Sequence, residues 1–349
     1  MIKVGIVGLG FMGMVHYLSY AKVRGVKVVA LCERDEKKRA GDWRGIQGNF
    51  GPPGERTDLA GVTAYAEVDD LLADPQVEVV DITLPPALHA DVACRALQAG
   101  KHVFCEKPLA MRLADCDRIR RAAHKADRRL LVGHVLPYFP EYAWALKEAS
   151  SGKHGRLLGG SFKRVISDPA WLANYWSAEI IGGPLLDLHV HDAHFIRMLF
   201  GRPVSLFTSG RTRNGLPEFW NTQFIYEAGG PTVHAVSGTI NQPGRPFQHG
   251  FELQFERATL VFDFAVLGKE AAYLCPPTVI PTSGAAKQVK LSGGDPMHAF
   301  QAELRDAMRA ISTDSEASAL EPQLARDAIE LCHLQAKSLA AGKPVKLSS

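Results

Sequence analysis

Three glycines near the start of the chain have the spacing of a phosphate-binding turn. Residues 8–13 read GLGFMG, a GxGxxG sequence between an apolar run and a pattern typical of a helix. In such a turn the first glycine permits the tight bend, the second lets a pyrophosphate approach the backbone, and the third lets helix and strand pack closely. The phosphates then bind N–H groups at the positive end of the helix dipole. We therefore expect a dinucleotide to be held by Gly8, Gly10, Phe11, Met12 and Gly13.

An acidic residue, Glu33, ends the next predicted strand, 20 residues after Gly13. At this place a carboxylate accepts hydrogen bonds from the ribose hydroxyls of a dinucleotide. The neighbouring Arg34 is able to pair with a 2′-phosphate, but Glu33 would repel that phosphate at close range. Glu33 and Arg34 together favour NAD as the cofactor, with NADP as the alternative.

Two further polar segments follow predicted strands of the same sheet. One begins at Thr83, the last residue of the run 79–83. The other is Glu106-Lys107-Pro108, which follows the run 102–105. Ligands of open parallel sheets bind outside the carboxyl ends of the strands. We therefore expect the cofactor to be faced by Thr83, Pro85, His89, Glu106 and Lys107.

A third polar group occurs in the second half of the chain. Gly182-Gly183-Pro184 precedes the sequence LLDLHVHDAH, which predicts a helix starting near Pro184. Asp187 and His191 then share one helix face, with His194 one turn further along it. The other positions are mostly apolar, so the helix should be deeply packed. A purely structural alternative is that Asp187 only orients a core histidine.

The elements that position these groups are predicted by hydrophobic periodicity. Short β-branched runs at 2–7, 26–32, 79–83, 102–105 and 130–135 alternate with helical patterns, which is typical of a doubly wound parallel sheet. Later strand-like runs follow one another with short turns, which indicates a mostly antiparallel sheet, and two helical patterns follow at 297–311 and 321–340. We predict an α/β chain with a Rossmann domain at 1–135 and an α+β substrate-binding and oligomerisation domain at 136–349. The Gly/Pro-rich stretch 45–61 is expected to run over the surface.

Composition excludes several classes of protein. The 349 residues carry a formal net charge of +3 without a long basic run, which makes nucleic acid a poor partner. The six cysteines form no CxxC pair and are expected to be buried thiols in a reducing compartment. No uninterrupted apolar run reaches the length of about 18 residues that indicates a membrane span, so we expect a cytoplasmic protein.

The order of these motifs resembles the glucose-fructose oxidoreductase / inositol dehydrogenase / MocA family of nicotinamide-dependent oxidoreductases. The resemblance implies hydride exchange with a sugar-like or cyclitol hydroxyl, and an open sheet that joins copies of the chain into a homodimer or homotetramer. It implies that Lys107 contacts the nicotinamide region and the substrate, and that Asp187 and His191 are the catalytic acidic residue and histidine. The chain departs from the common motif at two positions, where it has His189 and His194.

Oxidation of a secondary alcohol needs a base close to the hydroxyl oxygen. His191 is the candidate, since imidazole has an unperturbed pKa of about 6.5. Asp187 would orient the ring, and Lys107 would hold the oxygen or, alternatively, transfer the proton itself. Polar and aromatic residues expected on the substrate side are His134, Tyr138, Arg164, Trp171, Trp176 and His194. Core or lid packing is the alternative for the two tryptophans.

Three other functions use the same residues. Asp187, His191 and His194 are ligand types that zinc accepts, although we expect no metal because a nicotinamide already supplies the electrophile. A glycosidase that uses NAD for transient oxidation would need the same phosphate-binding turn. A non-catalytic sensor would keep the fold to bind a dinucleotide or sugar, but the joint presence of Lys107, Asp187 and His191 argues against it.

Overall fold

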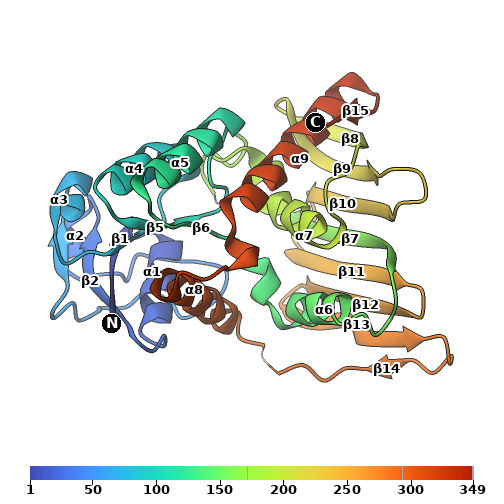
Figure 1. Ribbon diagram of the computed structural model, residues 1–349, viewed down its shortest axis with the longest axis horizontal. Helices are drawn as coiled ribbons and strands as arrows, with labels where there is room; N and C mark the ends of the chain where they lie inside the picture. The colour runs from blue at the N-terminus through green and yellow to red at the C-terminus, as the bar shows by residue number, and fades with distance from the viewer. Residues whose placement is uncertain (171, 293, 348–349) are drawn as a thin grey trace. The chain divides into compact units, whose positions relative to one another are not determined.

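The computed structural model describes residues 1–170, 172–292 and 294–347, which fold into two units (Figure 1). The first unit contains Met1–Phe139 and Gly293–Arg326, and the second contains Pro140–Ser292 and Asp327–Ser349. The sequence predicts one continuous second domain from residue 136, and this boundary needs a correction. Residues 293–326 return to the first unit because they carry a helix whose apolar face is buried there.

The first unit is built on a six-stranded parallel sheet in the order β3-β2-β1-β4-β5-β6. Its strands are β1 (Ile2–Val7), β2 (Val26–Cys32), β3 (Thr63–Tyr65), β4 (Val79–Ile82), β5 (His102–Glu106) and β6 (Leu130–Gly133). Its first five helices are α1 (Phe11–Tyr20), α2 (Glu36–Arg39), α3 (Val68–Ala73), α4 (Pro86–Gln98) and α5 (Leu113–Ala126). The predicted Rossmann sheet is confirmed. Strand order reverses between β1 and β4, which is where such sheets bind ligands.

The strands of this sheet are apolar because helices cover both of its faces. Val4, Ile6, Val79 and Phe104 are fully buried and form one core cluster. The short strand β3 escapes prediction because it has only three residues, none of them fully buried. A strand of this length carries too little periodic pattern to be detected.

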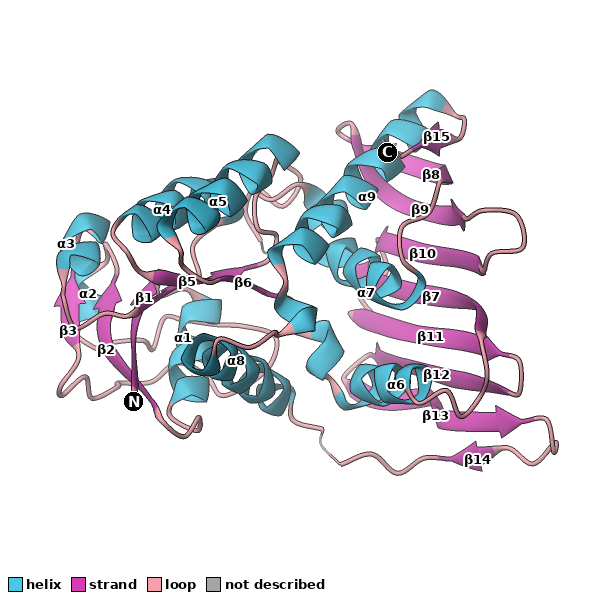
Figure 2. Ribbon diagram, viewed as in Figure 1, coloured by secondary structure: helices cyan, strands magenta, loops and turns pink. Residues whose placement is uncertain are grey.

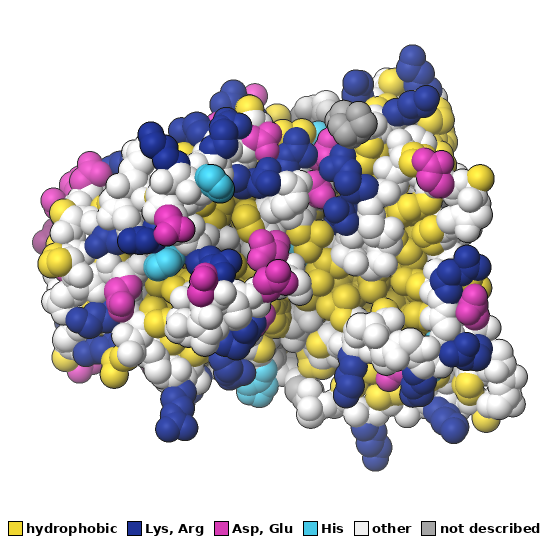
Figure 3. All heavy atoms as spheres, in the orientation of Figure 1, with side chains coloured by type: hydrophobic (Ala, Val, Ile, Leu, Met, Phe, Trp, Pro, Cys, Tyr) yellow, Lys and Arg dark blue, Asp and Glu magenta, His cyan; other side chains and the backbone are white. Residues whose placement is uncertain are grey.

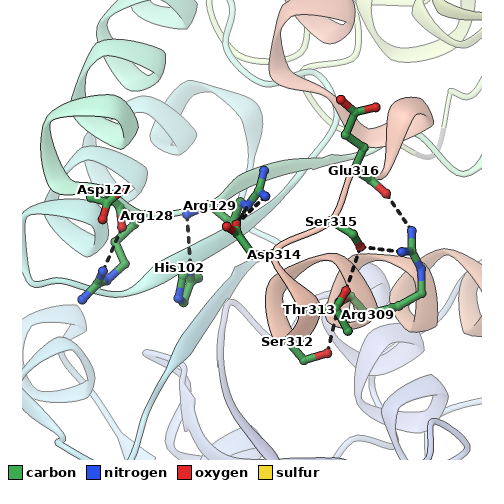
Figure 4. A network of polar contacts seen from close by, with 10 residues as sticks. All are labelled: His102, Asp127, Arg128, Arg129, Arg309, Ser312, Thr313, Asp314, Ser315 and Glu316. Atoms are coloured by element: carbon green, nitrogen blue, oxygen red, sulfur yellow. Dashed lines mark hydrogen bonds and ion pairs between the residues drawn. The ribbon is translucent and has the colours of Figure 1, made fainter.

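Helix α8 (Pro296–Thr313) ties the late part of the chain to this sheet. Asp295 caps its start by accepting a hydrogen bond from the Met297 backbone N–H at 2.9 Å, and Leu304 packs in the same core cluster as β1. Asp314, which directly follows the helix, accepts a hydrogen bond from Nε of Arg129 at 3.0 Å (Figure 4). Arg129 directly precedes β6. The helix is therefore part of the Rossmann unit although about 160 residues separate it from β6.

The same helix buries a carboxyl group. Glu303 is fully buried, and neither of its oxygens has a hydrogen-bond partner among the described residues. Burial, followed by the negative charge of Glu106, raises the pKa of Glu303 well above its usual value of 4.5. We conclude that the folded chain holds Glu303 in its neutral, protonated form at pH 7.

This conclusion predicts a pH-dependent effect on stability. Above about pH 4.5 the unfolded chain releases a proton that folded Glu303 keeps, so the wild-type unfolding free energy should lose up to ~1.4 kcal/mol per pH unit at this group. Glu303→Gln removes the group, so its stability relative to wild type should rise between pH 5 and 8. Urea unfolding at four pH values measures the difference. The exposed variant Glu270→Gln should show no such trend, and a pH-independent difference for Glu303→Gln would mean that Glu303 is ionised.

The second unit is built on a nine-stranded sheet in the order β14-β13-β12-β11-β7-β10-β9-β8-β15. Neighbouring strands of this sheet are antiparallel, except that β7 and β10 pair in parallel. This confirms the predicted mostly antiparallel sheet. The strands are β7 (Leu157–Ser167), β8 (Ser205–Arg213), β9 (Leu216–Ile225), β10 (Thr232–Ile240), β11 (Phe247–Phe255), β12 (Ala258–Leu267), β13 (Glu270–Pro281), β14 (Lys287–Gln288) and β15 (Val345–Lys346).

Helices α6 (Pro140–Ser150), α7 (Val190–Phe200) and α9 (Pro322–Ala341) all lie on one side of this sheet (Figure 2). The late helical patterns of the sequence correspond to α8 and α9. Among the described residues, no helix is both long and apolar enough to cross a membrane. On the face drawn in Figure 3, basic and acidic side chains are intermixed. All six cysteines are free thiols, and all except the half-buried Cys275 are buried.

Candidate active site

The glycine-rich turn has an open side and a closed side. Gly8 has a φ of +99°, a left-handed conformation that favours glycine. A Cβ added at Gly13 would collide with the carbonyl oxygen of Gly8, so only glycine permits this close approach of α1 to β1. At Gly10, a Cβ would meet nothing within 4 Å. The helix begins directly after Gly10, where its first N–H groups have no partner within the helix. This geometry fits a pyrophosphate, with Phe11 and Met12 supplying backbone N–H groups.

Glu33 lies against this turn. Its Oε2 accepts a hydrogen bond from the Leu9 backbone N–H at 2.7 Å, and its Oε1 accepts one from the Asp35 N–H at 3.0 Å. These bonds hold the carboxylate beside the turn, where a ribose hydroxyl would donate to its remaining lone pairs. Arg34 is exposed and directly adjacent.

The segments after β4 and β5 are tied to the turn and to each other. Thr83 Oγ1 donates to the Gly8 carbonyl oxygen at 2.7 Å, and Pro85 precedes the first turn of α4. The fully buried His89 has Nδ1 2.9 Å from the Pro108 carbonyl oxygen and Nε2 2.7 Å from the Leu84 carbonyl oxygen. Burial lowers the pKa of His89. With these contacts His89 connects the loops that follow β4 and β5, and its predicted contact with the cofactor stays a prediction.

Glu106 and Lys107 differ in exposure. The Glu106 side chain is buried, its Oε2 accepts a hydrogen bond from the Lys107 backbone N–H at 3.0 Å, and its Oε1 lies 3.1 Å from His16 Nε2. Lys107 is partly exposed and follows the carboxyl end of β5. Glu106 therefore holds the backbone that carries Lys107, whereas the Lys107 side chain stays partly exposed.

In the second unit, two glycines start the predicted helix. Gly182 and Gly183 have φ values of +83° and +63°, so a residue with a side chain would be strained at either position. The helix differs from prediction in its first turn: Leu185–His189 is a π-helix, and α7 begins at Val190. The wider π turn changes the angular spacing between Asp187 and His191 from that of a regular α-helix, and such turns often occur at functional sites.

Exposure separates Asp187 and His191 from the rest of this segment. Between residues 182 and 196 every residue is buried except these two, which are partly exposed. The structure therefore presents one carboxylate and one imidazole, one helical turn apart, on an otherwise buried segment. This is an arrangement in which the carboxylate can orient the ring for proton transfer.

The two additional histidines of the segment lie in the interior. His189 and His194 are both fully buried. His189 Nδ1 lies 2.7 Å from Ser237 Oγ, and its Nε2 lies 3.0 Å from Gln335 Nε2. Burial, followed by the charge of Arg164, lowers the pKa of His189 to about 3. Residues 1–170, 172–292 and 294–347 contain no group of three or more His, Cys, Asp or Glu side chains that could hold a metal ion.

Arg164 belongs to the core of the second unit. Its Nε donates to Asp192 Oδ2 at 2.6 Å, its Nη2 donates to Asp192 Oδ1 at 3.1 Å, and Nη2 also lies 3.3 Å from Tyr142 Oη. Both members of the ion pair are buried. The guanidinium thus fixes α7 to β7 and Tyr142, and the predicted contact of Arg164 with substrate stays a prediction.

The other predicted substrate residues are found in different surroundings. In the first unit, Tyr138 Oη donates to Asp306 of α8 at 2.7 Å, and His134 is fully buried. In the second unit, Trp176 Nε1 donates to Asp168 Oδ1 at 3.2 Å, and the Arg213 guanidinium lies 4.4 Å from the centre of its ring. Asp168, Trp176 and Arg213 line a pocket of the second unit. Leu172, Asn174, Tyr175 and Ser177 line the same pocket. Trp171 lies outside the described residues.

Two buried polar residues near the predicted site residues were not predicted from the sequence. Tyr175 is 2% exposed, and its hydroxyl has no hydrogen-bond partner among the described residues. Burial, followed by the charges of Asp187 and Asp168, raises the pKa of Tyr175. His16 is the second, a fully buried residue of α1. The available signals were an aromatic residue shortly before Gly182 and a histidine three residues after Gly13.

Comparisons with known proteins agree with this geometry. Residues 2–134 match the family model described as "Oxidoreductase family, NAD-binding Rossmann fold" (GFO_IDH_MocA). The uncharacterized oxidoreductase ORF334 of Rhizobium meliloti is 32% identical over 57% of this chain and 56% of its own length. The inositol 2-dehydrogenase of Salmonella typhimurium is 37% identical over 45% of this chain and 44% of its own length.

Solved structures extend the likeness over the whole chain. A levoglucosan dehydrogenase in complex with NADH and levoglucosan superposes with a TM-score of 0.80 at 20% identity, covering 100% of both chains. At this identity the likeness concerns the fold alone. The curated sequence matches, in contrast, span only about half of the relatives' lengths.

Proposed function

We propose that the whole chain is an NAD-dependent dehydrogenase, from the premise that residues 2–134 match the family model of NAD-binding Gfo/Idh/MocA oxidoreductases. Its proposed substrate is a secondary hydroxyl of a sugar, glycoside or cyclitol, or the corresponding ketone. The names of the relatives, an inositol 2-dehydrogenase and a levoglucosan dehydrogenase, support this class of substrate. The observation that carries the proposal is the isolated exposure of Asp187 and His191 on a buried segment.

The proposed mechanism assigns one task to each side chain. Bound NAD supplies a hydride acceptor at the C4 atom of its nicotinamide ring. His191 takes the proton of the substrate hydroxyl, and Asp187 orients the imidazole and stabilises its charged form. Lys107 donates a charge-assisted hydrogen bond to the same substrate oxygen. In the alternative assignment, Lys107 takes the proton and His191 donates the hydrogen bond.

A spectrophotometric scan tests the function. The purified chain would be incubated with NAD and a panel of inositols, aldoses, anhydrosugars and glycosides, and in reverse with NADH and keto-sugars. We expect NADH formation or consumption with at least one member. Release of nitrophenol from aryl glycosides without net NADH would instead identify the NAD-dependent glycosidase. Binding of NADH without turnover over the whole panel would identify a sensor, and calorimetry without heat for any pyridine nucleotide would overturn the proposal.

The choice of cofactor gives a second expected result. Glu33→Gln removes the charge that attracts ribose hydroxyls and repels a 2′-phosphate. A hydrogen bond to a charged group contributes about 1.5–3 kcal/mol, so the Kd for NADH should rise by ~10- to ~10²-fold while that for NADPH rises less or falls. Fluorescence titration with both nucleotides measures this change.

Glu36→Gln, on the exposed first turn of α2, is the matched control and should leave both dissociation constants unchanged. A wild-type protein that prefers NADPH tenfold would contradict the assignment of Glu33. So would a Glu33→Gln variant with an unchanged ratio of the two constants.

We also propose that the nine-stranded sheet joins copies of the chain. The long helices of the second unit lie on one side of the sheet, and large apolar side chains at its β12–β13 end are exposed: Leu267, Leu274 and Ile280. An open sheet face of this kind often forms an oligomer contact. Light scattering coupled to size-exclusion chromatography should therefore give a dimer or tetramer, and a monomer at micromolar concentration would contradict it.

A further inference from the structure

The helix that starts at the glycine-rich turn buries a histidine between two carboxyl groups of the sheet. His16 Nδ1 lies 2.9 Å from Asp81 Oδ2 on β4, and His16 Nε2 lies 3.1 Å from Glu106 Oε1 on β5. His16 and Asp81 are fully buried, and Glu106 is 6% exposed. The hydride transfer proposed above uses none of these side chains directly.

The two contacts together identify the charge of the ring. A neutral imidazole has a single N–H and can donate to only one carboxylate, whereas an imidazolium donates to both. Burial by itself lowers the pKa of His16, but the charges and hydrogen bonds of Asp81 and Glu106 raise it well above 6.5. Geometry and electrostatics therefore both favour an imidazolium.

The other groups that face His16 do not supply a second cation. Tyr20, on the same helix as His16, lies beside Asp81, Cys105 lies next to Glu106 on β5, and Glu303 approaches from α8. Burial raises the pKa of all three, so the phenol, the thiol and the carboxyl group remain neutral. The rings of Phe104 and Phe300 also lie near the imidazole, with ring centres 5.8 and 6.2 Å from its own. Without a proton on His16, two buried carboxylates would stand without a positive partner, which proteins avoid.

Glu106 connects this cluster to the predicted site. One of its oxygens faces His16, and the other accepts the backbone N–H of Lys107 at 3.0 Å. The carboxylate is thus held from both sides, and its position determines where the backbone of Lys107 lies. We propose that His16 is a positioning residue for Lys107, acting as a buried imidazolium that holds Glu106. This inference rests on the function proposed for Lys107.

The first experiment replaces the cation by a neutral side chain. In His16→Gln a neutral amide replaces the cation, and only its nitrogen can donate, since its oxygen is an acceptor like the carboxylates. We expect kcat to fall by ~10-fold or more, because a misplacement of about 1 Å in a catalytic group costs up to ~10²-fold, while the KM for NAD changes less. The defect should be larger at pH 8 than at pH 6, because at lower pH the cluster can take up a proton in place of the missing imidazolium charge. His16→Gln/Glu106→Gln, which pairs two neutral amides, should recover part of the loss and remove this pH dependence.

His102→Gln is the matched control because it makes the same substitution at the other end of β5, where His102 Nδ1 accepts the Arg129 N–H at 3.0 Å. It should keep wild-type kcat and the wild-type pH profile. A His16→Gln variant with wild-type kcat at every pH would overturn the proposal. A uniform loss, equal at pH 6 and pH 8 and not recovered by the double variant, would show that His16 only supports packing.

A second measurement does not depend on turnover. NMR of the full chain with labelled histidines, assigned by the signal missing in His16→Gln, reports the charge of the ring directly. We expect the His16 imidazole to remain protonated up to pH 8, and a neutral ring at pH 7 would overturn the inference. If the chain turned over no substrate but His16 stayed charged, the dehydrogenase proposal would fail while the charged cluster stood. If the chain turned over substrate with a neutral His16, the dehydrogenase proposal would stand and the charged cluster would fail.

Discussion

Replacing His191 by alanine is expected to lower kcat by at least ~10²-fold, and replacing Lys107 by alanine is expected to do the same, because general acid–base groups contribute ~10²- to ~10⁴-fold. His191 is partly exposed on an otherwise buried segment, and Lys107 follows the carboxyl end of β5. Steady-state kinetics with the substrate found in the panel measures both effects. If both groups act on the same step, the double variant should lose less than the product of the single losses.

The controls make the same substitutions at exposed positions. Lys125→Ala on α5 and His298→Ala on α8 should both retain wild-type kcat. The pH profile separates the two proton-transfer assignments, since the acidic limb of the profile should disappear in His191→Ala only if the imidazole is the base. Near-wild-type turnover in both His191→Ala and Lys107→Ala would refute the site.

Removing the Asp192 carboxylate is expected to destabilise the second unit by about 3–5 kcal/mol, the usual cost of leaving a buried charge without its partner. Arg164 donates to both oxygens of Asp192, at 2.6 and 3.1 Å, and its side chain is only 5% exposed. Asp192→Ala would leave this guanidinium facing an empty space in the core, so urea unfolding should show the loss.

Two comparisons make this result interpretable. Asp91→Ala removes a surface partner of Arg95, with side chains 65% and 36% exposed, and should cost at most ~1 kcal/mol. Arg164→Met/Asp192→Leu removes both charges together and should be more stable than Asp192→Ala. A loss for Asp192→Ala no larger than that for Asp91→Ala would mean that the pair contributes nothing to the fold.

The interaction also bears on the active-site segment. Asp192 directly follows His191 in the chain, so the bond from Arg164 fixes the turn that presents the imidazole. The sequence suggested Arg164 as one of the polar groups that bond substrate hydroxyls beside an aromatic residue. Its partner lies 28 residues away on another element, and only the folded chain brings the two together.

Local pattern predicted several features correctly. Alternating apolar runs predicted five of the six parallel strands, and the late helical periodicities predicted α8 and α9. Such patterns succeed because an element has to bury one face or stripe whatever it packs against. The glycines of residues 8–13 were predictable for the same local reason, since their backbone conformation is tied to the turn itself.

Features that depend on distant partners were not predictable. The return of α8 to the first unit, the placement of His16 between Asp81 and Glu106, and the connection of two loops by His89 each join elements far apart in the sequence. A histidine in an apolar helix has the same local pattern whether it meets carboxylates, carbonyl oxygens or a ligand.

The sequence by itself therefore determined the type and order of the elements, the dinucleotide turn and the residues with suitable chemistry. Only the tertiary structure decided which of those residues remain accessible. His189, His191 and His194 lie within six positions, and burial leaves only His191 partly exposed. The physical reason is that reactivity depends on solvent exposure and on charged neighbours, and both are set by the packing of elements that are remote in the chain.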